Sequence, residues 1–492
     1  MFVYYAVAVV AVLIIYYFIF AEDRSKEPPG PRPWPIIGNL LDIANASSDL
    51  TQTFGNLSEK YGEIFSIKVG MKRTVVLTSK EAMFTVIQHE AAMGRDRSGL
   101  FADRSFNKNL GIATGEGEIW EKSRVWMFKK LREYGFGKSM EMEHHIKDAC
   151  EALFSQIDKD SKEHGVVETN HIFNAHIMTI MWQMMFGPLS SKDFADLTRI
   201  SASSDDFVNS GVTGMGIINA FPFLRHICPR LLKYNVPMDF FNTCNDIAKK
   251  LFNEAKSRMK DLDVPTSLTE SFVQNCKSDG DIIFNCENFQ IMFQDLILGS
   301  TDTTSSYLES VVLYLILFPD IQEKIYQEIL DVAPDNRFIE FSDRKKMIYT
   351  QAFLLESHRN GRTLPNFVPR RALYDFYYKK YIIKKDTMIM VDTRLYYEDK
   401  ETWTDPEVFR PERFINENNE IFNASGIINF SVGKRNCPGE LYANVTSFLF
   451  LTSLLQRYKI SVPQGQPKPP MALSAGFALK PYPYQASFTR RV

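Results

Sequence analysis

The sequence predicts a helix-rich protein with a few short strands, an α+β mixture, and three observations lead to this prediction. Residues 140–290 show helical periodicity almost throughout. A further helical pattern runs from Asn288 towards Phe318, long enough to cross a whole domain. Strand-like alternation is confined to short segments, of which 63–70 and 73–78 read as a hairpin. Helices are therefore expected to dominate the fold.

The size and composition of the chain set broad limits. Its 492 residues are enough for two or three average domains or for one large enzyme domain. A hydrophobic content of 45% can fill a large core, and a net charge of −2 gives no general reason to expect a nucleic-acid partner. The six cysteines are scattered without a CxxC pair, which indicates a reducing compartment.

The chain begins with an uncharged, apolar stretch up to Phe20, of about the length that crosses a bilayer. This stretch lacks the basic start and the small-residue cleavage site of a signal peptide. Arg24 and Lys26 follow it, so the body of the protein is expected on the cytosolic side. We predict a single-pass transmembrane anchor over residues 1–21 and a charged, proline-rich linker over residues 22–35.

One cysteine lies in a distinctive segment, Phe430 to Gly439, which reads Phe-Ser-Val-Gly-Lys-Arg-Asn-Cys-Pro-Gly. Its glycines permit tight turns, and Arg435 adds positive potential that favours the thiolate of Cys437. An apolar run over residues 441–455 predicts a buried helix directly afterwards. A thiolate on such a loop suits an axial ligand of haem iron. The alternative is a buried structural cysteine beside a turn.

The pattern Phe-x-x-Gly-x-Arg-x-Cys-x-Gly is complete in this segment and resembles the haem-binding loop of the cytochrome P450 monooxygenases. The resemblance covers nearly the whole chain and looks closest to the drug- and lipid-oxidising microsomal enzymes of animals. It implies the cytochrome P450 fold, mainly α with small β-sheets, as a single haem-thiolate monooxygenase domain over residues 36–492 behind the anchor. It also implies haem b, bound through the thiolate of Cys437 as the iron ligand.

Five further residues are expected to bind the haem propionates. Trp120 and Arg124 lie four apart on one face of a predicted helix, and in the family this Trp-x-x-x-Arg pair holds a propionate. The family counterpart of Arg370 also gives a cation to a propionate. Arg435 and Arg95 complete the set, Arg95 standing at the start of a long loop rich in Gly, Asn and Asp. Two buried carboxylates require partners, so all five side chains should converge on them.

The centre of the long helix is unusually polar and reads Gly-Ser-Thr-Asp-Thr-Thr-Ser-Ser from Gly299. Small polar side chains are poor interior helix formers, because they compete for backbone hydrogen bonds. The stretch resembles the family's oxygen-activation segment, with Asp302 and Thr303 in the catalytic, proton-delivering positions and with Ser300 where the family usually has glycine. A local opening of the helix is expected there. The alternative is a Ser/Thr-rich kink in a core helix.

Glu356 and Arg359 lie three apart in a predicted helix over residues 347–359 and can form an ion pair, although Glu-x-x-Arg alone is a weak motif. Arg413 can join the same carboxylate. The resemblance places this triad behind the cysteine-bearing loop, where its role is structural.

Three other segments have expected positions. Strand-like segments at 381–383 and 388–391 flank a turn. The segment 473–479 looks like a hairpin tip, which is expected to point into the substrate pocket. The segment 221–234, with basic residues among apolar ones, suits either contact with a membrane surface or a solvated amphipathic helix pair.

The resemblance implies a monooxygenase that inserts one oxygen atom from O2 into a lipophilic small molecule: a xenobiotic, a steroid or a fatty acid. Electrons would come from NADPH through a diflavin reductase, with cytochrome b5 as a further partner, at the endoplasmic reticulum membrane. The basic helix over residues 122–138 is a suitable docking surface for an acidic reductase. Two alternatives stay open: an isomerase or peroxide-using enzyme that needs no reductase, and a non-enzymatic haem- or lipid-binding protein. Asp302 and Thr303 argue against both, since neither alternative needs proton delivery.

Overall fold

The computed structural model describes most of the chain, but the predicted anchor of residues 1–21 lies almost wholly outside the described residues. So do residues 475–477, at the tip of the predicted C-terminal hairpin. The described residues are 4, 10–12, 15, 24–46, 50–137, 139–209, 217–261, 263–276, 281–474 and 478–491. None of the helices within these ranges is both long enough and apolar enough to cross a bilayer.

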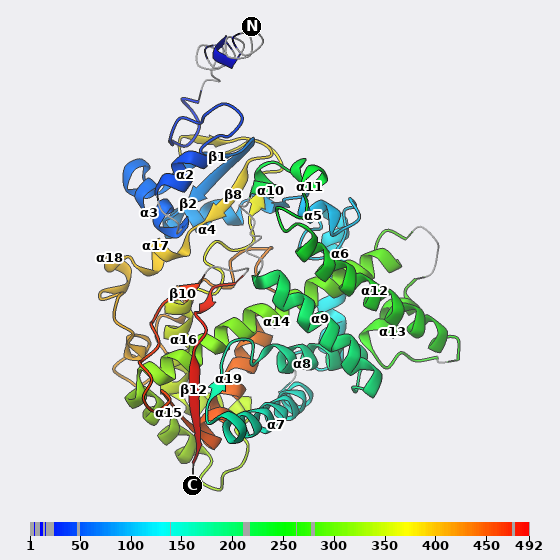
Figure 1. Ribbon diagram of the computed structural model, residues 1–492, viewed down its shortest axis with the longest axis vertical. Helices are drawn as coiled ribbons and strands as arrows, with labels where there is room; N and C mark the ends of the chain where they lie inside the picture. Colours follow the sequence, from blue (N-terminus) through cyan, green and yellow to red (C-terminus); the bar gives the residue numbers. More distant parts are fainter. Residues whose placement is uncertain are drawn as a thin grey trace.

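Helices make up most of the structure and fill the lower and right-hand parts of Figure 1. In chain order they are α2 (Leu40–Ala46), α3 (Leu50–Tyr61), α4 (Lys80–Gln88), α5 (Leu100–Asp103), α6 (Gly117–Glu133), α7 (Ser139–His164), α8 (Asn174–Phe186), α9 (Ser191–Asn209), α10 (Ile217–Ala220), α11 (Leu224–Ile227), α12 (Asn235–Arg258), α13 (Leu268–Gln274), α14 (Cys286–Leu317), α15 (Pro319–Val332), α16 (Ile348–Gly361), α17 (Thr393–Tyr397), α18 (Lys400–Trp403) and α19 (Glu440–Arg457). Short 3-10 turns are η1 (Glu90–Met93), η2 (Phe341–Lys346), η3 (Pro411–Phe414) and η4 (Ala424–Gly426).

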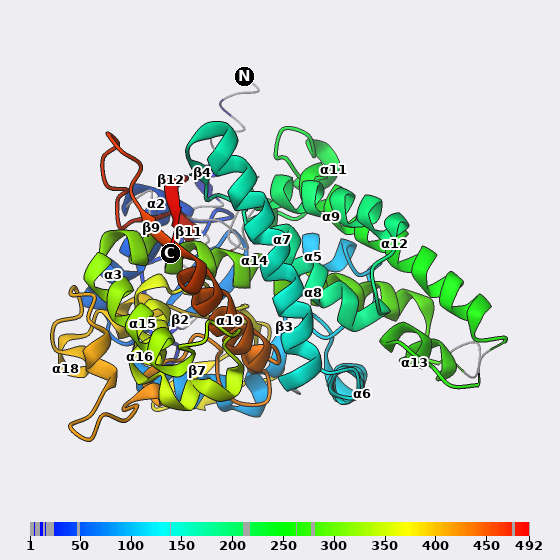
Figure 2. The same ribbon diagram turned by 90° about the horizontal axis from the view of Figure 1, so that it is seen from below.

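The 32-residue helix α14 lies in the middle of the helical part in both ribbon views and packs against α8, α12, α16 and α19 (Figures 1 and 2). Asn285 caps its first turn, with its side chain accepting from the N–H of Asn288 at 2.8 Å. The observed bounds agree with the predicted long helix. The predicted helices over residues 347–359 and 441–455 are likewise present, as α16 and α19.

A five-stranded sheet forms the other part of the molecule, in the upper left of Figure 1, in the order β1–β2–β8–β5–β3. Its strands are β1 (Ile64–Val69), β2 (Lys72–Leu77), β3 (Gly94–Arg95), β5 (Arg370–Arg371) and β8 (Met388–Val391). The predicted hairpin is confirmed, because β1 and β2 pair antiparallel from Ile64 opposite Leu77 to Val69 opposite Lys72. β2 and β8 run parallel, and the remaining neighbours run antiparallel.

Smaller sheets complete the described fold. They are formed by β4 (Val167–Glu168), β12 (Gln485–Arg490) and β9 (Tyr458–Ser461), by β6 (Phe376–Tyr378) and β7 (Tyr381–Ile383), and by β10 (Leu473–Ser474) and β11 (Lys480–Pro481). The predicted strands at 381–383 and 388–391 belong to different sheets, since β7 pairs with β6 whereas β8 joins β2. The fold is mainly α with small β-sheets in a single domain, as the sequence predicts.

The proline-rich segment that follows the predicted anchor packs against β1. The N–H of Ser66 donates to the carbonyl of Pro29 at 2.7 Å. Gly30 fits there only as glycine, because an added Cβ would lie 1.9 Å from Ser66 O. Asn39 extends the contact by donating its N–H to the carbonyl of Lys68 at 2.7 Å. This part of the segment therefore belongs to the folded body.

Candidate active site

The segment Phe430–Gly439, called the cysteine loop below, is held in a turn by its own backbone. The N–H of Cys437 donates to the carbonyl of Phe430 at 2.7 Å. Gly433 has a φ of +76°, a left-handed conformation that favours glycine. Gly439 then caps α19, so Cys437 lies just before the amino-terminal end of an 18-residue helix.

The sulfur of Cys437 faces a recess. Its side chain is exposed, yet desolvation by surrounding protein raises the pKa of the thiol. An accessible sulfur that is also desolvated lies in a concavity rather than on the outer surface. The N–H of Gly439 and the charge of Arg124 lower the same pKa, while Glu440 raises it. Arg124 therefore stabilises the thiolate of Cys437. The guanidinium of Arg435, which the sequence singles out, lies against Trp120 and donates to two backbone carbonyls.

Four largely buried arginines from separate segments lie around the cysteine loop. We call them the arginine cluster: Arg95, Arg124, Arg370 and Arg435. Arg95 and Arg370 lie opposite each other on the neighbouring strands β3 and β5. Arg124, on α6, donates through Nη2 to the carbonyl of Asn436 at 2.9 Å. The structure thus brings together the four arginines that the sequence predicts.

Trp120 joins the arginine cluster, since the guanidinium of Arg435 lies 3.8 Å from the centre of its indole ring. Arg435 also donates to the carbonyls of Met93 at 3.1 Å and Gly115 at 2.6 Å. Trp120 Nε1 and Arg435 Nη1 are nevertheless buried without a hydrogen-bond partner in the described part of the chain. Buried donors are nearly always satisfied, so these two indicate an acceptor that the protein does not itself provide.

The arginine cluster carries excess positive charge. Burial, together with repulsion from neighbouring arginines, lowers the pKa of Arg95 to about 10, of Arg370 to about 9 and of Arg435 to about 8. Glu116 and Asp295 oppose this effect at Arg95, but Glu116 is already bonded to another arginine at 2.7 Å. Like charges gathered in a desolvated region require anionic partners. The two propionates of a haem fit this requirement.

The central helix α14 is buried along its length except at one place. Between Asn288 and Ile316, a stretch described in full, only Gly299 and Thr303 are not buried. A Cβ added to Gly299 would meet no atom within 4 Å. Because the two residues lie four apart on one helical face, they open onto a common space beside the helix.

Thr303 makes the bond that the sequence predicts, with Oγ1 donating to the carbonyl of Gly299 at 2.7 Å. The neighbouring Ser300 and Asp302 are buried. The predicted local opening of the helix is wrong as an interruption, because α14 is helical without a break from Cys286 to Leu317. A carbonyl oxygen has two lone pairs, so it can accept from a hydroxyl while the helical turn stays intact.

Asp302 belongs to a buried group of ionisable side chains that reaches solvent. Burial raises the pKa of Asp302 to about 6 and of Glu309, also on α14, to about 7, while nearby positive charges on Lys480 and His171 oppose both shifts. The backbone N–H of His171 donates to Glu309 Oε1 at 2.7 Å. The imidazole Nε2 of His171 lies 3.1 Å from Lys480 Nζ. Its Nδ1 lies 3.1 Å from Asp205, whose side chain is 34% exposed. We call these five residues the carboxylate cluster.

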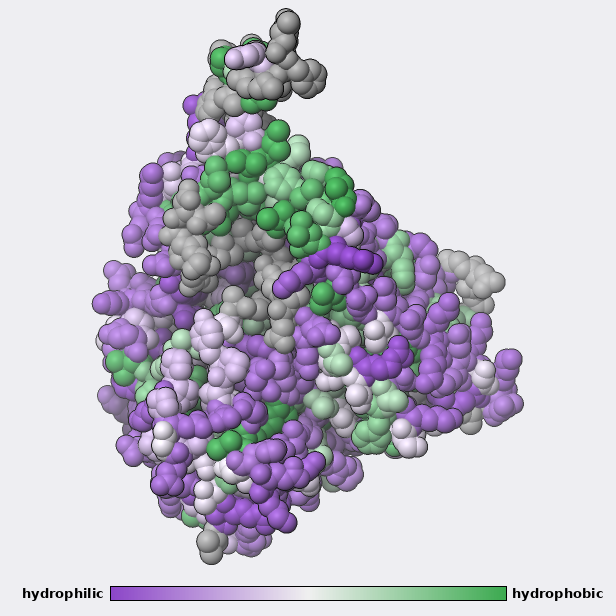
Figure 3. All heavy atoms as spheres, in the orientation of Figure 1, coloured by the Kyte–Doolittle hydropathy of each residue, from purple (hydrophilic) through white to green (hydrophobic). Residues whose placement is uncertain are grey.

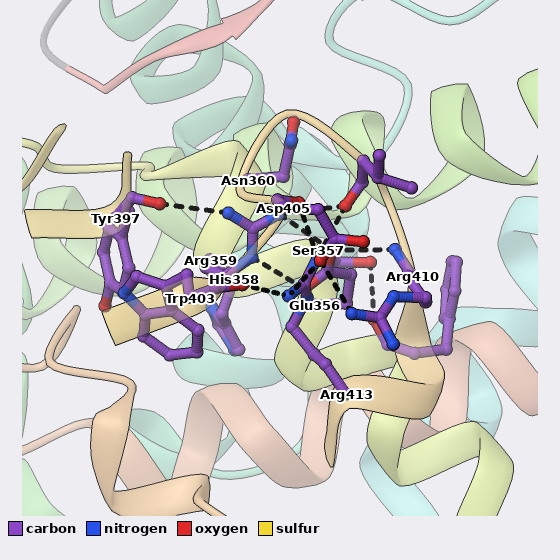
Figure 4. Close-up of polar contacts among 12 residues, drawn as sticks. Glu356, Ser357, His358, Arg359, Asn360, Tyr397, Trp403, Asp405, Arg410 and Arg413 are labelled. Carbon is purple, nitrogen blue, oxygen red and sulfur yellow. Dashed lines mark hydrogen bonds and ion pairs between the residues drawn. The ribbon is translucent and has the colours of Figure 1, made fainter. Parts of the chain in front are cut away.

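The predicted ion-pair triad of Glu356, Arg359 and Arg413 is confirmed (Figure 4). Glu356 accepts from Nε and Nη2 of Arg359, both at 2.8 Å, and Arg413 Nε lies 3.0 Å from Glu356 Oε2. Arg359 also donates to the carbonyl of Tyr397 at 3.1 Å. The hydroxyl of Tyr397 donates to Asn429 Oδ1 at 2.6 Å, just before the cysteine loop. We call Glu356, Arg359 and Arg413 the glutamate network. Through Tyr397 and Asn429 it helps to fix the start of the cysteine loop.

Helix α6 lies against the cysteine loop through Arg124, and its outer face carries exposed cations such as Lys129. It ends at Glu133, earlier than the predicted basic helix over residues 122–138, because Gly135 turns the chain with a φ of +101°. The last predicted cation of that helix, Lys138, lies outside the described residues.

The chain matches the family model for Cytochrome P450 over residues 28–488. It belongs to the cytochrome P450 family. It is 29% identical to Farnesoate epoxidase of Bombyx mori, covering 99% of this chain and 98% of that protein. It is 32% identical to Cytochrome P450 2H2 of Gallus gallus, over 96% of this chain and 95% of that protein, and 29% identical to Cytochrome P450 2D9 of Mus musculus, over 97% and 96%.

Cytochromes P450 bind haem through a cysteine thiolate and act as monooxygenases, so this chain is a haem-thiolate oxidoreductase. The predicted family, fold, cofactor and enzyme class are thereby confirmed, and the non-enzymatic alternative is excluded. The accessible sulfur, the arginine cluster and its two unpartnered donors fit such a cofactor.

The sequence reading missed four members of the carboxylate cluster: Asp205, His171, Glu309 and Lys480. Glu309 left a signal, since it is a charged residue within the mostly apolar second half of the helix and lies seven residues after Asp302, and residues seven apart share a face. The other three come from distant segments and share no spacing pattern.

Proposed function

We propose that Cys437 is the thiolate ligand of the haem iron and that the arginine cluster, with Trp120, binds the propionates. The observation that carries this proposal is an accessible sulfur at the start of α19, close to two buried donors, Trp120 Nε1 and Arg435 Nη1, that lack partners. The N–H of Gly439 and the helix terminus stabilise negative charge on the sulfur. Bound haem supplies the redox chemistry that activates O2.

The protein itself contributes proton delivery to the proposed reaction, through Thr303 and Asp302 of α14. Thr303 lies at the open face of α14, where its hydroxyl oxygen can accept a hydrogen bond from water while its proton is held on Gly299 O. Asp302 directly precedes Thr303 on the same helix and, with a pKa of about 6, exchanges protons near neutral pH. The carboxylate cluster resupplies Asp302, because His171 links Lys480 to the partly exposed Asp205.

The proposed substrate is a lipophilic small molecule, either a xenobiotic, a steroid or a fatty acid. Asp295 lies one turn before Gly299 and has its carboxylate occupied by Arg104 and by the N–H groups of Ile112 and Ala113, at 2.7 and 2.9 Å. It therefore offers no free charge to a substrate in the space beside α14. One relative is named for epoxidation of farnesoate, so farnesoate belongs in the first substrate panel.

The proposed electron donor is an NADPH-dependent diflavin reductase, with cytochrome b5 as a second donor at the same face. Arg124 joins α6 to the cysteine loop, so the outer cations of this helix lie on the Cys437 side of the molecule. Lys122 and Lys129 are exposed there and suit an acidic partner. This arrangement favours a reductase-dependent enzyme over an isomerase or peroxygenase.

The proposed location is the endoplasmic reticulum membrane, with the body of the protein on the cytosolic side and residues 1–21 as the anchor. Figure 3 shows an apolar patch, in green, at the end of the molecule where the N-terminal segment leaves it. The turn between β1 and β2 packs against α10, because an added Cβ on Gly70 would lie 2.5 Å from the carbonyl oxygen of Ala220. Exposed apolar side chains in this turn, in the N-terminal segment and in or beside α11 are Trp34, Ile36, Met71, Phe223, Ile227 and Leu231. A patch of this kind, partly within the segment 221–234, suits contact with lipid.

Replacement of Cys437 by serine tests the ligand. Serine provides no thiolate, so Cys437→Ser should lose the thiolate-type absorption of the reduced, carbon monoxide-bound protein. It should also lose NADPH-dependent oxidation of the substrate panel in the presence of reductase. Cys286→Ser, at another partly exposed cysteine, should keep both. A thiolate-type spectrum retained by Cys437→Ser would overturn the assignment.

A further inference from the structure

Three stacked rings join the helices α14 and α16 to the cysteine loop. The central ring is the imidazole of His358, which lies beside Arg359 of the glutamate network on α16 (Figure 4). It lies flat on the ring of Tyr307, with the ring centres 3.9 Å apart and the planes 6° apart. Phe430, the first residue of the cysteine loop, meets the imidazole edge-on, at 5.4 Å and 70°. The imidazole therefore connects α14 to the loop that carries Cys437.

Phe430 passes this contact on to the backbone of Cys437. Its carbonyl accepts the N–H of Cys437 at 2.7 Å. The preceding residue, Asn429, donates through Nδ2 to the carbonyl of His358 at 2.6 Å. His358 thus holds the start of the cysteine loop through its ring and through its backbone, with a single residue between the imidazole and Cys437.

His358 also contacts the helix that follows the cysteine. Its imidazole forms a hydrogen bond with the side chain of Asn444, on α19. Burial lowers the pKa of His358 to about 3, although the bond with Asn444 opposes this shift. The imidazole is therefore uncharged at pH 7 and acts through packing and hydrogen bonding. It contacts the chain both before and after Cys437.

The far side of the stack is fixed on α14. The hydroxyl of Tyr307 donates to the carbonyl of Leu354 at 2.8 Å, and the ring is buried. Tyr307 lies four residues after Thr303, and α14 is helical throughout this stretch. The stack thus ties the cysteine loop to the helix whose open face carries Thr303. This tie is separate from the glutamate network, which reaches the loop through Tyr397.

We propose that His358 is a positioning residue for the iron ligand: its ring holds Phe430 in place and, through Phe430, the backbone of Cys437, so that the sulfur stays bound as a thiolate. The inference rests on the proposal that Cys437 is the ligand. Residues that orient a metal ligand tune the potential of the metal as well as its binding. Loosening the stack should weaken electron donation by the thiolate and raise the reduction potential.

The test compares two variants of the full chain loaded with haem. His358→Gln keeps a hydrogen-bonding group for Asn444 but removes the ring, whereas His358→Phe keeps the ring and removes the hydrogen bond. The control, Phe252→Leu, removes a ring of α12 that contacts Phe272 and Phe289. Two quantities are measured: the rate at which the reduced, carbon monoxide-bound protein loses its thiolate-type absorption in mild urea, and the reduction potential. Urea unfolding of the haem-free proteins reports general stability.

We expect His358→Gln to lose the thiolate-type absorption about tenfold faster than wild type and to have a more positive reduction potential. His358→Phe should stay close to wild type in both. Phe252→Leu should lower the stability of the haem-free protein without changing either quantity. Wild-type behaviour of His358→Gln, an equal defect in His358→Phe, or an equal defect in Phe252→Leu would each overturn the inference.

A double-mutant cycle tests the route through Phe430. Phe430→Leu should reproduce the defect, and His358→Gln/Phe430→Leu should be no worse than the more affected single variant, because both changes break one contact. Additive effects of the two changes would contradict this route. Failure of the wild-type protein to show any thiolate-type absorption would instead contradict Cys437 as the ligand, so the two proposals fail in different ways.

Discussion

The arginine cluster and the glutamate network both bury arginines beside the cysteine loop, but they balance charge in different ways. In the glutamate network, the fully buried carboxylate of Glu356 holds Arg359 at 2.8 Å and Arg413 at 3.0 Å. In the arginine cluster, burial and repulsion from other arginines lower the pKa of Arg370 and of Arg435. We call the glutamate network saturated in charge, because Glu356 and Asp405, 3.3 Å from Arg413, supply its counter-charges, and we call the arginine cluster unsaturated, because its arginines outnumber their carboxylates.

This difference separates a structural network from a ligand-binding one. A saturated network leaves no charge for an outside partner, and breaking it exposes an unpaired buried ion. An unsaturated network is costly in the protein alone and is stabilised when an anion arrives. The carboxylate cluster is a third case, because its three carboxyl groups face Lys480 and His171, and two of them, Asp302 and Glu309, titrate close to neutral pH, which suits proton transfer.

The largest effect is expected when the saturated network is broken. Glu356→Gln leaves Arg359 and Arg413 buried without their carboxylate, which should cost about 3–5 kcal/mol of unfolding free energy. Urea unfolding and the yield of haem-containing protein measure the loss. Glu323→Gln, at an exposed carboxylate paired with Arg491 at 3.3 Å, should change stability by less than about 0.5 kcal/mol. A loss below about 1 kcal/mol in Glu356→Gln would show that the two arginines do not depend on Glu356 for their counter-charge.

The carboxylate cluster gives a pH-dependent effect of intermediate size. Burial raises the pKa of Glu309 from 4.5 to about 7, against the opposing charges of His171 and Lys480, while the negative charge of Asp302 adds to the shift. The unfolded chain releases this proton at lower pH than the folded protein. The stability associated with protonated Glu309 is therefore fully present below about pH 4.5 and is lost as the pH rises through about 7.

Glutamine at this position keeps an oxygen for the His171 N–H but does not titrate. Glu309→Gln should therefore match wild type near pH 4.5 and exceed it by on the order of 2 kcal/mol above pH 7. Urea unfolding across this range measures the difference between the two proteins. A difference that is the same at every pH would mean that the carboxylate does not titrate as described.

A smaller effect, on catalysis rather than folding, is expected at the open face of α14. Thr303→Ala removes the hydroxyl that bonds to Gly299 O, so proton delivery should fail while haem binding is kept. The ratio of oxidised product to NADPH consumed should fall about tenfold, with hydrogen peroxide taking up the difference. Thr452→Ala removes a similar back-bonded hydroxyl from α19 and should leave the ratio unchanged. An unchanged ratio in Thr303→Ala would make the polar stretch a purely structural feature.

The sequence predicts best what is local. The cysteine loop, the hairpin β1–β2 and the helix α14 are each continuous segments, so spacing and alternation alone identify them. The ion pair between Glu356 and Arg359 is equally local, because three residues separate its partners on one helix. The resemblance to a known family then supplies the residues that converge on one cofactor from separate segments.

The sequence predicts poorly what depends on contacts between distant segments. His171 and Lys480 meet only because β11 packs beside α14 in the folded chain. The contribution of Arg124 to the electrostatics of Cys437 was missed for the same reason. Arg435 is close in sequence, and its guanidinium contacts Trp120 and Gly115, whereas Arg124 reaches the cysteine loop from the distant helix α6 and lowers the pKa of Cys437.

The contrast between the arginine cluster and the glutamate network is tested most directly by the stability of Arg370→Gln with and without haem. Burial and the charges of Arg95 and Arg124 hold the pKa of Arg370 at about 9, so removing this charge should stabilise the haem-free protein by about 1 kcal/mol or more. The same change removes a propionate partner, so haem should bind about tenfold more weakly. Urea unfolding of both forms, together with haem transfer to an acceptor protein, should give opposite signs for the two effects. Loss of stability in the haem-free form, or unchanged haem affinity, would contradict the assignment of the arginine cluster to an anionic ligand.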